Sequence, residues 1–109
     1  MEELYAKFLP QFVELARERL QRAVAVARTV AQQDEATLTA VVRDLHAIAG
    51  EAGLLGMVLL VPLARSAEDH AKRLRDRHAE ADATALLGAL KELEQAVEVV
   101  SAGFPPKEA

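Results

Sequence analysis

Cysteine is absent from the 109-residue chain, which excludes a disulfide-stapled scaffold. Positive charge is in deficit, because thirteen Lys and Arg stand against seventeen Asp and Glu and give a formal net charge of −4. That sign argues against an electrostatic grip on nucleic acid, so we expect a protein or small-molecule partner. A single domain of this length buries about two-thirds of the surface that its unfolded chain exposes, enough for a core without metal or disulfide.

Long apolar runs are also absent. The longest, residues 54–64, is interrupted by Gly56 and Pro62 and falls short of the roughly 18 to 20 residues that span a bilayer. The opening MEELYAKFL carries two early acids, unlike the basic start and long apolar segment of a secretory signal. We therefore expect a cytoplasmic protein with no membrane insertion.

Glycine and proline are scarce, at five and four residues, and apolar residues recur at three- and four-residue steps almost throughout. This pattern predicts an all-α protein with helices over about 5–33, 34–56, 58–76 and 82–103. Pro10 is expected to mark the true first turn of the first helix, leaving residues 2–9 as a short separate turn or helix. Asp34 and Asp82 are expected to cap the second and fourth helices, and Gly56 to end the second.

Short connections between these segments make neighbouring helices antiparallel, which predicts an up-down four-helix bundle over residues 1–103. The final residues 104–109, FPPKEA, resemble the start of a linker to another domain. Such bundles host many unrelated activities, so function has to be argued from a site.

The segment HAIAGEAGLLG offers one, because it places Gly50, Gly53 and Gly56 just beyond His46. A glycine inside a helix costs about 0.5 to 1 kcal/mol relative to alanine. Helical spacing puts Gly50 and Gly53 on one line with His46, on a flank away from the apolar stripe. One interpretation is a nucleophilic histidine beside a strip that another folded surface can approach closely.

The alternative is that the glycines end a helix and begin a loop, which leaves His46 an ordinary surface histidine. Periodicity alone slightly favours this alternative. Against it, Ala52 and Leu55 continue the apolar stripe through the glycines.

Glu68 is a candidate partner for the histidine. With a turn near Gly56, His46 lies ten residues before it and Glu68 twelve after, so both reach roughly the same height. A carboxylate there would hold Nδ1–H and leave Nε2 outward. A solvated Glu68 is an equally good reading, because the sequence does not say on which side of the hairpin each flank falls.

These residues resemble histidine phosphotransfer (HPt) domains, in particular the phosphoacceptor domain of CheA-type chemotaxis kinases. The family's pattern is a histidine, a lysine three residues on, then glycine, and further glycines that end the helix. The similarity as a whole covers practically the entire chain. The resemblance implies that His46 accepts phosphate, that Glu68 orients its imidazole, and that Ala49, Gly50 and Gly53 face the docking partner.

The chain departs from that pattern at the lysine place, which holds Ala49, and at Glu51 after the glycine. Both changes subtract positive charge near an incoming phosphoryl group. Three nearby cations are candidates to balance it: Arg43, Arg65 and Lys72. Arg65 is preferred, because a guanidinium pairs well with phosphate oxygens.

The resemblance also implies partners, since such a domain is a phosphocarrier rather than an enzyme by itself. A receiver domain would supply a phospho-aspartate and Mg²⁺, or a kinase ATP domain would supply ATP and Mg²⁺, so no cofactor is expected in this domain. The start at Met1 and the Pro-Pro tail favour the first domain of a CheA-type histidine kinase over a free relay protein.

Other functions remain open. A degenerate HPt-like bundle would dock a receiver or kinase domain without carrying phosphate, as Ala49 and Glu51 suggest. A metal-binding bundle lacks paired inward ligands, so no metal is expected. A bundle that only dimerises would use off-stripe residues such as Val26 and Val99.

Overall fold

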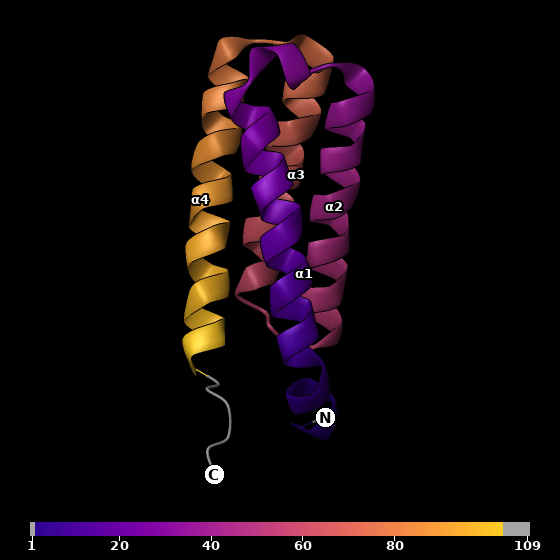
Figure 1. Ribbon diagram of the computed structural model, residues 1–109, viewed down its shortest axis with the longest axis vertical. Helices are drawn as coiled ribbons and strands as arrows, with labels where there is room; N and C mark the ends of the chain where they lie inside the picture. Colours follow the sequence, from indigo (N-terminus) through magenta and orange to yellow (C-terminus); the bar gives the residue numbers. More distant parts are fainter. Residues whose placement is uncertain (1, 104–109) are drawn as a thin grey trace.

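The structure is a computed structural model that describes residues 2–103, with side chains from Ala6 onward. It contains the helices α1 (Glu2–Arg28), α2 (Glu35–Leu54), α3 (Leu60–Arg77) and α4 (Glu80–Gly103), with a short 3-10 turn η1 (Val30–Gln32) (Figure 1). The predicted all-α four-helix bundle is confirmed. The linker expected at 104–109 lies outside the described residues.

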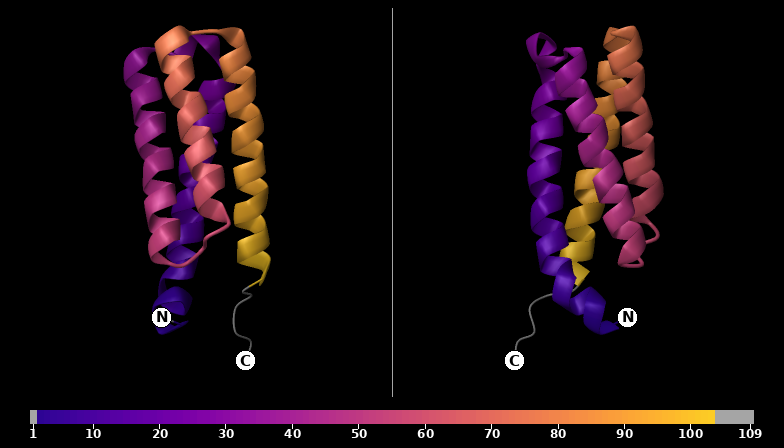
Figure 2. Two further views of the ribbon diagram at one scale, coloured as in Figure 1. Left: turned by 180° about the vertical axis from the view of Figure 1, so that it is seen from behind. Right: turned by 90° about the vertical axis from the view of Figure 1, so that its right-hand side faces the viewer.

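Consecutive helices run antiparallel, and each packs against two neighbours (Figures 1 and 2). α2 packs on α3, α3 on α4, α4 on α1, and α1 on α2. The α2–α3 turn lies at the same end of the bundle as the start of α1 and the end of α4 (Figure 1). The α2–α3 face and the α1–α4 face are therefore opposite sides of the molecule.

The core is built from leucine and alanine stripes on all four helices. Its largest fully buried side chains are Leu20, Leu38, Leu45, Ile48, Leu60, Leu74, Leu86, Leu90, Leu93 and Val97. Burying each such leucine contributes about 1.5 to 3 kcal/mol. Between α2 and α3 the buried residues include alanines, among them Ala52, Ala64 and Ala67, whose small side chains let the two helices pack closely.

The first helix differs from its prediction at both ends. Pro10 lies inside α1, which is one helix from Glu2, so the separate N-terminal helix is wrong. The first turns of α1 lean away from the rest (Figure 2, right), as expected where proline removes a backbone donor. At the other end α1 stops at Arg28, and Gln33 Nε2 donates to the carbonyls of Val26 at 3.0 Å and Ala27 at 3.1 Å.

Of the two predicted N-terminal helix caps, one is confirmed and the other is wrong. Asp34 caps α2, accepting from Thr37 N–H at 2.7 Å, and this bond lowers the pKa of the Asp34 carboxyl. Asp82 does not cap α4, because the helix begins two residues earlier at Glu80. Instead Asp82 is buried in the first turn of α4 and accepts two bonds from Arg77, at 2.7 and 3.2 Å.

The turn between α2 and α3 is longer than predicted, because α3 begins at Leu60 and not at Val58. Gly56 has φ 78, in the left-handed region that favours glycine, so the residue predicted to end the helix does lie at the turn. Among the described helices, none is long and apolar enough to cross a membrane.

Candidate functional site

The segment around His46 is helical throughout. α2 continues to Leu54 and includes both Gly50 and Gly53, so the alternative of a loop starting at these glycines is wrong. Ala52 is fully buried and Leu55 packs against the core, which keeps the last turns of α2 on the bundle. His46 is therefore held on a rigid helix with its side chain 69% exposed.

α3 brings Glu68 to this histidine. Glu68 Oε2 lies 3.3 Å from His46 Nδ1, and the carboxylate is one of two buried acidic groups among the described residues. The residue is only 7% exposed, so the reading of Glu68 as a solvated side chain is wrong. The α2–α3 hairpin thus places an exposed imidazole against a buried acid.

This contact favours one tautomer of the imidazole. An ionised carboxylate can only accept a hydrogen bond, so the hydrogen of a neutral His46 ring lies on Nδ1. Nε2 is then left with a free lone pair on the opposite edge of the ring. Because the side chain is mostly exposed, that lone pair is available to a partner in solution.

The three candidate cations differ in their relation to this pair. Lys72, one turn beyond Glu68 on α3, has its Nζ 3.4 Å from Glu68 Oε2. Arg43 on α2 and Arg65 on α3 are exposed, and neither forms an ion pair with any residue whose side chain the structure describes. The cation joined to the site is thus Lys72, whereas sequence reasoning preferred Arg65.

The two departures from the family pattern have different structural meanings. Ala49 is only 2% exposed and belongs to the core, so it offers almost no surface to a docking partner. Glu51 lies toward α1 and pairs with Arg19, with Arg19 Nη1 donating to Glu51 Oε1 at 3.0 Å. The negative charge of Glu51 is therefore compensated on the α1 side of α2.

Gly50 and Gly53 are exposed on α2, and the domain itself does not require glycine at either position. A Cβ atom at Gly50 would meet nothing within 4 Å, and one at Gly53 would meet only Val61 Cγ2 at 3.9 Å. Neither position has a positive φ. The missing side chains leave open space beside His46 on the outside of the domain.

Sequence patterning did not single out an apolar surface at the α2–α3 turn. Leu54, Val58 and Leu59 are 76%, 72% and 79% exposed, and they lie one, five and six residues after Gly53. The signal was present in residues 54–64, where apolar residues fill more positions than one buried helix face needs. Exposed apolar clusters of this kind mark interaction sites in soluble proteins.

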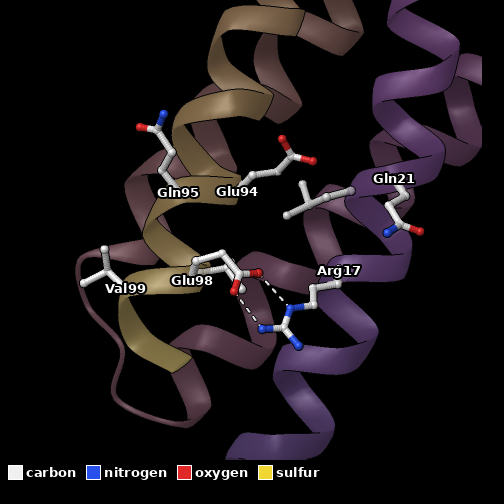
Figure 3. Close-up of a pocket in the computed structure, with 8 residues that line it drawn as sticks. Arg17, Gln21, Glu94, Gln95, Glu98 and Val99 are labelled. Carbon is white, nitrogen blue, oxygen red and sulfur yellow. Dashed lines mark hydrogen bonds and ion pairs between the residues drawn. The ribbon is translucent and has the colours of Figure 1, made fainter. Parts of the chain in front are cut away.

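The opposite side of the bundle carries an open groove between α1 and α4, with a volume of about 670 Å³. Arg17 and Glu98 face each other there and form two hydrogen bonds of 2.7 Å (Figure 3). These bonds lower the pKa of Glu98 and raise that of Arg17. This pair joins the two helices, and it lies on the face of the bundle away from His46.

Two further features considered from the sequence are a dimer surface and a metal site. Val26 is buried and Val99 is 71% exposed, so the two residues named for a dimer do not form one surface. Among the described residues, no group of three or more His, Cys, Asp or Glu is placed to hold a metal ion.

The fold and site define a class of protein: an antiparallel four-helix bundle that presents an exposed histidine in contact with a buried acid of the next helix. A family model for the Hpt domain matches residues 7–103, nearly the whole chain, and the protein belongs to this family. Membership implies histidine phosphotransfer in a phosphorelay. Comparison with curated proteins and with solved structures gave no match.

Proposed function

We propose that the domain accepts a phosphoryl group on Nε2 of His46 and passes it to the aspartate of a response-regulator receiver domain. The donor is the ATP-bound domain of a histidine kinase or a phosphorylated receiver, and it supplies the Mg²⁺ and any nucleotide. The observation that carries this proposal is the contact of 3.3 Å between His46 Nδ1 and the buried Glu68 Oε2.

The chemistry needs little else from this chain. The Nε2 lone pair attacks phosphorus while the bond from phosphorus to the donor oxygen breaks, and the leaving group departs as a carboxylate or as ADP. No proton has to leave Nε2, because the Glu68 contact keeps the ring hydrogen on Nδ1. Phosphoryl transfer depends mainly on alignment and charge stabilisation, which an exposed, oriented imidazole allows.

The docking face proposed for these partners runs along α2 from His46 through Gly50 and Gly53 to the exposed Leu54. Val58 and Leu59 extend it around the turn. Open space at the glycines lets the partner's backbone approach the imidazole, and the apolar end gives it a surface to bury.

The direct test is labelling of the purified domain by a panel of kinase cores and phosphorylated receivers. We expect acid-labile, base-stable label on the wild type and none on His46→Gln, with unchanged helical content. His70→Gln and His78→Gln are matched controls, because His70 lies within α3 and His78 directly after its end, whereas His46 lies on α2. Both variants are expected to label normally. Full labelling of His46→Gln would refute the assignment.

A second candidate function is docking without phosphate. It is favoured by Ala49, which is buried where the family pattern has a lysine. Receiver binding by a wild-type domain that takes no label from any donor would establish this alternative.

A further inference from the structure

A lysine of α3 completes the His46 site. Lys72 Nζ lies 3.4 Å from Glu68 Oε2, and the same oxygen lies 3.3 Å from His46 Nδ1. An imidazole nitrogen from α2 and an ammonium group from α3 therefore lie beside the same carboxylate oxygen. The spacing from Glu68 to Lys72 is four residues on α3, with the acid N-terminal to the base, which is the favourable order for such a pair.

Burial makes this second partner important. The Glu68 side chain is 9% exposed, so water compensates its charge poorly. An unpaired carboxylate in that place would repel a phosphoryl group, which carries about −2 at neutral pH. With Lys72 beside it, the incoming group meets a pair whose charges cancel.

The position of Lys72 also bears on the missing lysine of α2. Ala49 is 2% exposed and offers no cation, while the Lys72 side chain is 45% exposed and reaches the site from the facing helix. We infer that Lys72 is a positioning residue that compensates the charge of Glu68 and so permits phosphorylation of His46. This inference rests on the proposed function and moves the cation of the site from α2 to α3.

The test compares Lys72→Met, Lys72→Arg and the matched control Lys91→Met, an exposed lysine of α4. Labelling is followed with phosphoramidate, a small phosphodonor, so that partner docking does not enter. We expect Lys72→Met to label roughly fivefold more slowly and to lose its phosphohistidine sooner. Lys72→Arg should restore most of the rate, because the charge is kept, and Lys91→Met should match the wild type.

A double-mutant cycle shows whether Lys72 acts through Glu68. In a Glu68→Gln background the charge that Lys72 compensates is gone, so adding Lys72→Met is expected to change the rate little. An equal slowing in both backgrounds would overturn the inference, as would wild-type labelling by Lys72→Met. In either case the proposed function stands if the wild type labels and His46→Gln does not. A wild type without label would overturn both.

Discussion

At the scale of single residues, the site depends on a contrast in exposure. His46 has a side chain 69% exposed, while the acid that holds its Nδ1 has a side chain 9% exposed. Burial fixes the position of Glu68, and exposure leaves Nε2 accessible. Residue spacing predicts the height of both residues along the hairpin, but whether Glu68 faces His46 depends on how the two helices rotate against each other.

Removing the acid tests this contrast. We expect Glu68→Ala to label more slowly than the wild type, by roughly 10- to 100-fold, because the imidazole loses its oriented tautomer. Asp69→Ala is the matched control, since Asp69 is the exposed neighbour on the same turn of α3. Initial rates of labelling at constant donor concentration measure the effect. Equal rates for Glu68→Ala and Asp69→Ala would show that the contact has no role in the transfer.

At the scale of elements, α2 carries two exposed glycines where alanine would be the better helix former. Gly50 has no neighbour within 4 Å of a Cβ position, and Gly88 on α4 is in the same situation. Stability alone explains neither glycine; at Gly50 the proposed approach of a partner would account for the missing side chain.

Substitutions at Gly50 and Gly88 separate an effect on helix stability from an effect on partner docking. Gly50→Ala and Gly88→Ala are each expected to stabilise the domain by about 0.5 to 1 kcal/mol in chemical denaturation, since both glycines lie inside helices with open space around them. A phenylalanine at each position tests docking. Gly50→Phe should label poorly from protein donors and Gly88→Phe normally. Normal transfer to Gly50→Phe would remove the close-approach argument.

The start of α2 makes a prediction about pH. The bond from Thr37 N–H lowers the pKa of Asp34 in the folded state, so its stabilising effect is present above the unfolded value, about 4. The effect is lost as the pH falls through the lower folded pKa. Asp34→Ala is therefore expected to lower Tm near neutral pH and to differ less from the wild type as the pH falls below 4.

Thermal unfolding followed by circular dichroism between pH 2 and 7 measures this difference. Asp34→Asn is the control, because asparagine is also a good cap but does not titrate. A Tm difference between Asp34→Ala and the wild type that stays constant over this range would contradict the assignment.

At the scale of the whole molecule, we expect the proposed chemistry and much of the stability to be separable. The site lies on the α2–α3 face, while α4 contributes the fully buried Leu86, Leu90 and Leu93 to the core. A substitution that creates a cavity at one of these leucines is expected to lower the free energy of unfolding without altering His46 or Glu68 directly.

Leu93→Ala is expected to cost about 2 to 5 kcal/mol of stability, the usual range for a buried leucine. Labelling at a temperature where the variant is still folded should proceed at the wild-type rate. Urea denaturation gives the first quantity and the initial labelling rate the second. A large loss of labelling in fully folded Leu93→Ala would mean that the site depends on packing across the whole bundle.

The sequence by itself determined what depends on local spacing. Apolar stripes of the helical period predicted the four helices, and the register of His46, Gly50 and Gly53 on one flank of α2 follows from the same geometry. The Asp34 cap was also predictable, because its partner lies three residues away. The predictions at Pro10 and Asp82 were wrong. Pro10 lies inside a continuous helix, and Asp82 accepts hydrogen bonds from Arg77 and does not cap α4.

Only the tertiary structure decided which side chains meet across helices. Helix rotation buried Glu68 against His46, turned Glu51 toward Arg19 on α1, and joined Lys72 to the site in preference to Arg65. Spacing along one helix sets angles about its own axis, but contacts between helices depend on how their side chains interlock. That packing is a property of the assembled core, so no single segment of the sequence reveals it.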